Sequence, residues 1–68
     1  MNIHYSLAVA DVGLEHPIMY IEGACDSDET KPVDYIADGS IMVESNTGDV
    51  YFFNAKTETW IKQFSFQG

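Results

Sequence analysis

The stretch that decides the fold runs from Ile41 to Phe66 and reads IMVESNTGDVYFFNAKTETWIKQFSF. Three runs rich in β-branched and aromatic residues, at 41–44, 50–53 and 59–66, are separated by two short polar segments. Such runs are typical of strands, and short loops between consecutive strands make those strands antiparallel neighbours. The stretch therefore predicts a three-stranded antiparallel meander.

The first loop of this meander, residues 45–49, has the composition of a hairpin turn. Gly48 can adopt the positive φ of a bulged turn, and Asn46 tolerates turn geometry. Two registers are compatible with the sequence. A four-residue turn places Val43 opposite Phe52, whereas a bulge at Gly48 places Val43 opposite Tyr51.

The aromatic side chains of the meander exceed what one covered face of a small sheet can hold. After a second loop at 54–58, period-two alternation predicts Trp60, Phe64 and Phe66 on one face, with Lys62 between them. Exposed aromatic patches mark partner surfaces. Two alternatives remain for these rings. They can fill the core and pack against the underside of the long loop, or they can form a platform on which a sugar stacks. The predicted protein interface consists of Tyr51, Phe53, Trp60, Phe64 and Phe66.

Two further strands are expected before the meander. Residues 3–10 alternate large apolar with small or polar side chains, which is typical of a half-buried strand. A turn over 11–16 follows. Pro17 can open a second strand over 18–22, because a missing N–H is least harmful at the start of a strand. The expected fold class is all-β, a small antiparallel sheet of about five strands in a single domain spanning 1–68.

A long acidic loop, residues 23–39, separates these strands from the meander. Loops of this length are usually functional or mobile. Lys31 is the single cation among its carboxylates. The carboxylates either keep the protein soluble and block edge pairing, or they face a basic partner by mimicking a phosphate array. The predicted acidic patch consists of Glu22, Asp26, Asp28, Glu29, Asp34 and Asp38.

The charge and size of the chain limit its partners. The 68 residues include 11 acidic residues against 3 lysines and arginines, a net charge of −8. No basic patch exists to contact phosphates, so direct nucleic-acid binding is not expected, and anionic membranes are disfavoured for the same reason. No apolar run approaches the roughly 20 residues of a membrane span. A chain of this size buries only about 60% of its surface on folding, which favours a homo-oligomer or a place in a larger protein assembly.

Residues able to carry chemistry are few. Cys25 is the only cysteine, and the acidic residues that follow it should raise its thiol pKa and oppose nucleophilic chemistry. His4 and His16 are the only histidines and have no third ligand at a metal-binding spacing. The D-x-D-x-T run at 26–30 is not followed by the glycine and glutamate of a calcium loop. The sequence therefore predicts no enzyme activity, no metal site and no cofactor.

A series of short motifs spans residues 28–63: TKP at 30–32, DGS at 38–40, NTGDVYFFN at 46–54 and TWIK at 59–62. This series resembles a segment of small β-rich proteins from the head and tail gene region of tailed bacteriophages. The resemblance implies a non-enzymatic structural or accessory virion protein that docks on a capsid, neck or tail assembly. Such a protein is expected in the virion and, before assembly, in the host cytoplasm. The alternative is a small acidic phage inhibitor, a nucleic-acid mimic that blocks a host nuclease or defence protein.

Overall fold

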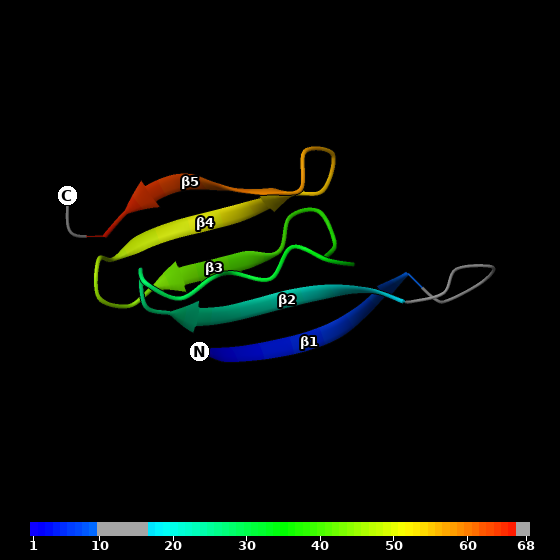
Figure 1. The fold of residues 1–68 in the computed structure, drawn as a ribbon, viewed down its shortest axis with the longest axis horizontal. Coiled ribbons are helices and arrows are strands. Elements are labelled where there is room, and N and C mark those ends of the chain that lie inside the picture. The colour runs from blue at the N-terminus through cyan, green and yellow to red at the C-terminus, as the bar shows by residue number, and fades with distance from the viewer. Residues whose placement is uncertain (10–16, 67–68) are drawn as a thin grey trace.

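The computed structural model describes residues 1–9 and 17–66, and within them it contains five strands and no helix. They form one sheet in the order β1-β2-β3-β4-β5 (Figure 1). The all-β expectation and the C-terminal meander are confirmed. The expected turn over 11–16 lies outside the described residues, and so does His16. The strands are β1 (Asn2–Val9), β2 (Ile18–Cys25), β3 (Ile41–Glu44), β4 (Asp49–Asn54) and β5 (Thr59–Ser65).

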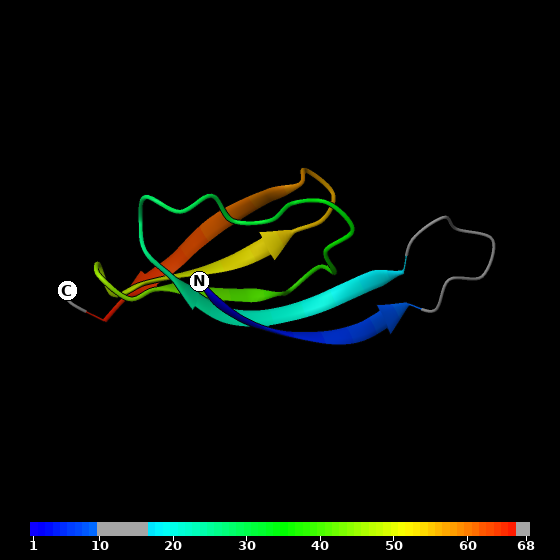
Figure 2. The same cartoon turned by 60° about the horizontal axis from the view of Figure 1, so that its bottom comes forward.

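The sheet is mixed rather than antiparallel, because β2 and β3 run parallel. The other three neighbouring pairs are antiparallel. Parallel neighbours need a long crossover connection, and residues 26–40, here called the crossover segment, provide it. Figure 2 shows this segment passing over one face of the sheet. The antiparallel expectation is wrong at this pair. β2 continues to Cys25, beyond its expected end at Glu22, and residues 22–25 pair in parallel with residues 41–44.

The crossover segment is attached to β2 through its own backbone and one buried hydroxyl. Met19 donates its N–H to the Tyr35 carbonyl at 2.9 Å and accepts from the Ala37 N–H at 2.7 Å. The Ser40 hydroxyl accepts the Ile21 N–H at 3.0 Å and donates to the Ala37 carbonyl at 2.8 Å. These contacts hold Ser40, the last residue of the crossover segment, beside Ile21, and β3 starts from there in the same direction as β2.

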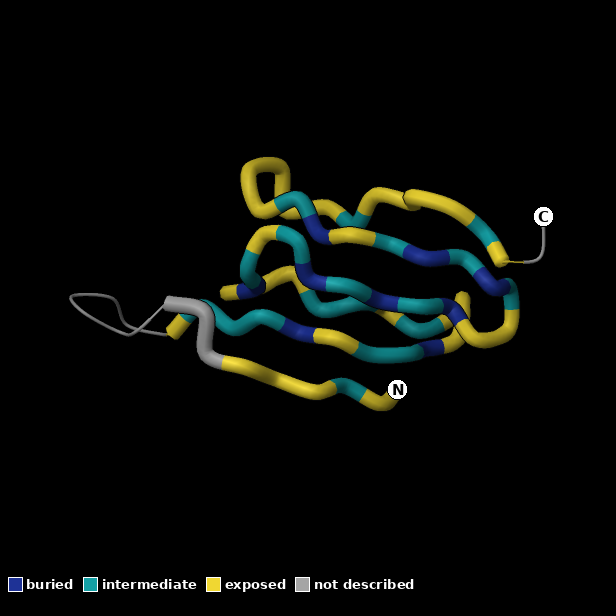
Figure 3. Tube along the Cα trace, turned by 180° about the vertical axis from the view of Figure 1, so that it is seen from behind, coloured by how far each residue is buried: buried dark blue, intermediate teal, exposed yellow. Residues whose placement is uncertain are grey.

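The core lies between the crossover segment and the sheet. Ile36 of the crossover segment is buried in this cluster, and Ile3, Met19 and Trp60 pack against it. Burial is concentrated in β2, β3 and β4, whereas β1 and β5 are mostly exposed (Figure 3). The sheet therefore has one covered face, supplied by a single irregular segment. The strand residues in the buried cluster are Ile21, Cys25, Met42 and Phe53.

The first hairpin of the meander adopts neither expected register. Val43 lies opposite Val50, and the ladder continues to the pair Glu44–Asp49. The Gly48 N–H donates to the Glu44 carbonyl at 2.8 Å, which closes the loop. Gly48 has a φ of 79°, so the positive φ expected there is confirmed. Both expected registers are wrong because the loop consists of residues 45–48: β3 ends at Glu44 as expected, but β4 begins at Asp49, one residue before its expected start.

A bulge in β5 changes which aromatic rings share a face. The β4–β5 register shifts between Val50 and Tyr51, which leaves Gln63 as an extra residue in β5. An extra residue of this kind interrupts the alternation of side chains between the two faces. Phe64 therefore lies on the opposite face from Trp60, and the expectation that these rings share a face is wrong.

Candidate protein-docking surface

The covered face of the sheet is closed by a nearly buried ion pair. Lys31 Nζ of the crossover segment lies 2.6 Å from Glu44 Oε2 and 4.2 Å from the centre of the Tyr51 ring. The side chains of Lys31 and Glu44 are 12% and 7% exposed. The Thr47 hydroxyl donates to the other oxygen of the Glu44 carboxylate at 3.1 Å. The one cation of the acidic loop thus ties the crossover segment to β3 and β4.

A second attachment closes the other half of the covered face. Trp60 Nε1 donates to the Pro32 carbonyl at 2.8 Å. The Trp60 ring lies 5.0 Å from the Phe53 ring, centroid to centroid, and Phe53 is 3% exposed. Three of the five rings of the predicted interface, Tyr51, Phe53 and Trp60, therefore lie beneath the crossover segment.

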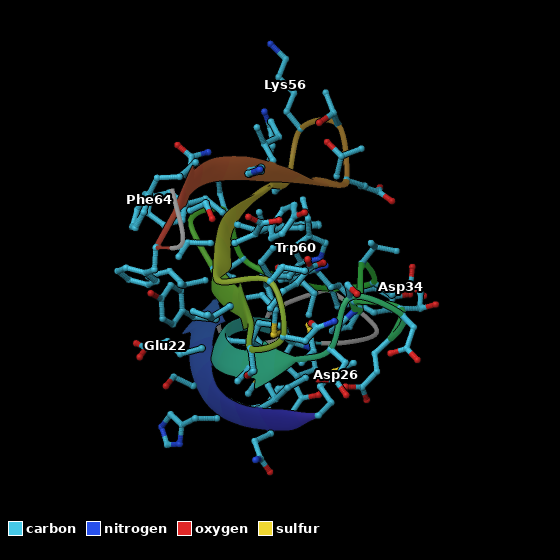
Figure 4. The ribbon with its side chains drawn as sticks, turned by 90° about the vertical axis from the view of Figure 1, so that its left-hand side faces the viewer. Glu22, Asp26, Asp34, Lys56, Trp60 and Phe64 are labelled. Atoms are coloured by element: carbon cyan, nitrogen blue, oxygen red, sulfur yellow. The ribbon has the colours of Figure 1, made fainter. Side chains whose placement is uncertain are left out.

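The opposite face of the sheet is not covered by any described segment, and Figure 4 shows Phe64 on this side, away from the crossover segment. Phe52 pairs with Ile61, and Phe64 lies edge-to-face against Phe66 with ring centroids 5.3 Å apart. Phe52, Ile61, Phe64 and Phe66 are 39%, 45%, 49% and 72% exposed. These four residues, with the half-buried Tyr20, Ile41 and Val43 beside them, form what we call the open face.

Two features distinguish the open face from an ordinary solvated sheet surface. Val50 is buried but does not belong to the core cluster, because it points to this side with its partner Phe64. Glu22 is the only Asp, Glu, Lys or Arg that alternation places on this side of the described strands. Although the chain has a net charge of −8, the described strands place one carboxylate on this surface. Asp38 lies at its edge, where it lines a pocket of about 220 Å³ together with Phe52 and Ile61.

The six carboxylates of the predicted acidic patch do not gather in one place. Glu22 projects from the side of the open face, whereas Asp26 and Asp34 project from the crossover segment on the other side (Figure 4). Asp28 is exposed in the turn after β2. The sheet therefore separates Glu22 from the carboxylates of the crossover segment.

Two of these carboxylates have local structural partners. Glu29 accepts the Asp26 N–H at 2.8 Å and lies 3.2 Å from the N-terminal amine. The Asp26 N–H and the amine hold the pKa of Glu29 below its usual value, against a smaller opposing effect of desolvation. Asp38 accepts the Ala55 N–H at 2.9 Å and joins the crossover segment to the second hairpin.

Cys25 and the polar residues show no catalytic arrangement in the described part of the chain. Burial raises the pKa of the Cys25 thiol, Lys31 opposes this, and Glu44 and other nearby carboxylates add to it. The expected direction is confirmed, although burial rather than the following acidic residues is the main cause. Within residues 1–9 and 17–66, no three His, Cys, Asp or Glu side chains converge as metal ligands would.

A pocket of about 470 Å³ lies on the covered side, between the crossover segment and the second hairpin loop. Tyr35 and Glu58 both line it, and they are the two non-glycine residues with positive φ in the described chain, at 59° and 55°. Every buried side-chain nitrogen or oxygen among the described residues has a hydrogen-bond partner. The pocket therefore offers no unpaired buried polar atom for ligand recognition.

Sequence reasoning missed Phe52 and Ile61 as members of the exposed surface. Strand alternation places both on the open face once Phe53 and Trp60 are known to lie on the covered face. The sequence alone does not show which face the crossover segment covers. No family model, no curated protein and no solved structure matches the chain. The described residues contain no helix long and apolar enough to cross a membrane.

Proposed function

We propose that this chain is a non-enzymatic structural or accessory protein of a phage virion. It is held in a capsid, neck or tail assembly by burying its open face against protein. The open face is the observation that carries the docking role. The resemblance of residues 28–63 to phage head and tail proteins supports the virion as the place of docking.

The size and chemistry of the open face support a contact with protein. At about 200 Å² for a large side chain, the exposed fractions of its four most accessible residues amount to roughly 400 Å² of apolar surface. Patches of this size on a small soluble domain are often functional. Phenylalanine rings lose little conformational freedom on binding, and aromatic side chains are enriched in the centres of protein interfaces.

The alternative function, a nucleic-acid mimic, is less well supported by the positions of the carboxylates. A mimic needs its carboxylates in one array that a basic cleft can contact. Glu22 lies on the opposite side of the sheet from Asp26 and Asp34 (Figure 4). Glu29 and Asp38 are engaged by backbone N–H groups of the chain itself. We therefore favour docking through the open face over electrostatic mimicry.

The test is quantitative mass spectrometry of gradient-purified particles made by the phage that encodes the chain. The wild-type chain is expected in a fixed ratio to the major virion proteins. The Phe64→Ser chain is expected at least about tenfold depleted, because it removes an exposed ring from the open face. Tyr5→Ser is the matched control, since Tyr5 is 53% exposed and pairs with Ile21 on the other face. Absence of the wild-type chain from particles would contradict the proposed function.

A further inference from the structure

We infer that the occupant of the open face is a second copy of this chain, so that two sheets pack face to face as a sandwich. This rests on the proposed function, in which the open face is buried against protein: that protein is a neighbouring copy within the assembly, so the two-sheet pair, rather than the single chain, is the unit that enters the particle. Three observations lead to it: the distribution of charge, the apolar area of the face, and the attachment of the crossover segment to the other side.

Charge is the first observation. The chain carries 11 acidic residues, yet only Glu22 lies on the open side of the described strands. A surface that evolved to meet a basic partner would display carboxylates there, because complementary charges select such partners. A surface of exposed rings with a single strand carboxylate, Glu22, fits an equally apolar surface better than a basic one. A second copy supplies one, and it keeps the remaining carboxylates of both chains in solvent.

Area is the second observation. Each side of a standard interface buries about 800 Å². The four most exposed residues of the open face supply roughly half of this area. The half-buried Tyr20, Ile41 and Val43 and the uncharged residues at its margin extend the surface across four strands. Together these residues bring the face near the roughly 500 Å² per side that a specific interface needs at least.

Layer architecture is the third observation. A sheet buries an apolar face against a second layer, and two sheets pack about 10 Å apart with their strands within about 30° of each other. The crossover segment cannot supply the second layer for the open face. It is held on the other side by the Lys31–Glu44 ion pair and by the hydrogen bond from Trp60 to Pro32. A twofold axis through the open face gives each copy the layer that it lacks.

Sedimentation equilibrium of the purified chain tests this directly, from about 1 to about 500 μM. The wild type is expected to shift from the 7.6 kDa chain mass toward twice that mass. Phe64→Ser and Phe52→Ser are each expected to weaken the dimer at least tenfold. Tyr5→Ser, on the other face, is expected to stay within about threefold of the wild type. Circular dichroism confirms that each variant is folded.

A second measurement needs no substitution. In a mixed sample of isotope-labelled and unlabelled wild-type chains, isotope-filtered nuclear Overhauser effects report contacts between copies. They are expected between the Phe64 or Phe66 rings and the methyl groups of Ile61 or Val43. A wild type that remains at the monomer mass up to 500 μM overturns the inference. Intermolecular contacts confined to β1 or to the crossover segment overturn it equally.

The failure of this inference and the failure of the proposed function give different results. If the chain is a monomer that still enters particles, and the Phe64→Ser variant is depleted from them, the open face binds a different protein. A dimer through the open face that is absent from particles retains the sandwich but not the virion role. Loss of both leaves the open face without a protein partner.

Discussion

At the scale of single residues, Lys31 joins the crossover segment to β3 and β4. Its ammonium group meets the Glu44 carboxylate and the Tyr51 ring at once. Breaking a buried ion pair from one side leaves the remaining charge without compensation, whereas replacing both partners with apolar residues is often neutral. The pair therefore fixes the position of the crossover segment more than it adds net stability.

Lys31→Met is expected to lower the free energy of unfolding by about 3 kcal/mol, because it leaves Glu44 buried and unpaired. The double variant with Glu44→Met is expected to recover to within about 1 kcal/mol of the wild type. Urea denaturation measures both. Lys56→Met is the matched control, since Lys56 is exposed at the tip of the second hairpin (Figure 4). Equal effects of Lys31→Met and Lys56→Met would contradict this role.

Asp49 gives the sheet a pH dependence. Burial raises the pKa of Asp49, but hydrogen bonds from Ser65, Lys62 and Thr47 and the Lys62 charge together hold that pKa below its usual value. A carboxyl group whose pKa is lowered on folding stabilises the protein above its unfolded pKa, about 3.9 for aspartate. This contribution is lost as the pH falls through the lower, folded pKa.

The urea midpoint of the wild type is therefore expected to fall more steeply between pH 5 and pH 2 than that of Asp49→Asn. The two curves converge at the acidic end, where the Asp49 contribution of the wild type is lost. Parallel curves over the whole range would show that the Lys62–Asp49 contact, at 3.3 Å, does not stabilise the fold.

At the level of elements, the close pairing of β1 with β2 requires a glycine at position 23 of β2. A Cβ atom at Gly23 would collide with the Asn2 carbonyl oxygen and lie 3.0 Å from Ile3 Cα. These are backbone atoms of β1 and cannot move aside without breaking the β1–β2 ladder. Gly39 makes the contrast, because a Cβ atom there meets open space and only its φ of 82° resists substitution.

Gly23→Ala is expected to displace β1 and to raise hydrogen exchange at the amides of residues 3–6 at least tenfold. Gly39→Ala is expected to cost about 1 kcal/mol through backbone strain but to leave β1 protected. Hydrogen exchange followed by mass spectrometry distinguishes the two. Unchanged protection of β1 in Gly23→Ala would show that β1 can shift its register to accommodate the methyl group.

The elements differ in how far the sequence determines them. The strands of the meander were predictable because their alternation and turn residues are local signals. The parallel β2–β3 pair was not, because it joins residues about 19 positions apart, such as Glu22 and Ile41, which meet only after the crossover segment folds back. The extra residue Gln63 has no local signal either, and it moved Phe64 and Phe66 to the open face.

The same limit applies to the candidate docking surface. Phe64 and Phe66 were named from their ring chemistry, and the structure leaves both exposed. Tyr51 and Trp60 were named for the same reason, but contacts with Lys31 and Pro32 cover them. Ring chemistry indicates that a side chain can bind protein. The position of the crossover segment, together with the extra residue Gln63 in β5, decides which rings remain accessible.

At the scale of the whole molecule, the net charge of −8 opposes any contact between two copies. Apart from Glu22, the carboxylates of the described strands lie on the other side of the sheet, so repulsion between copies acts largely through solvent and is screened by salt. The Debye length falls from about 30 Å at 10 mM to about 8 Å at 150 mM ionic strength. Self-association through an apolar face is therefore expected to strengthen as salt is added.

The dimer dissociation constant is expected to fall at least about threefold between 10 mM and 150 mM salt. Sedimentation equilibrium at the two ionic strengths measures it. A contact between carboxylates and a basic surface has the opposite dependence, because salt weakens it. A dissociation constant that rises with salt would therefore contradict an apolar contact between copies.

Hydroxyl-radical footprinting tests the burial of the open face most directly, because it reports the solvent exposure of individual side chains. Oxidation of Phe52, Phe64 and Phe66 is measured in the wild type at about 3 μM and at about 300 μM. We predict that these three rings become several-fold less reactive at the higher concentration, while Tyr5 and Tyr35 keep the same rates. If the oxidation rates of Phe52, Phe64 and Phe66 are the same at both concentrations, the open face is not buried by self-association.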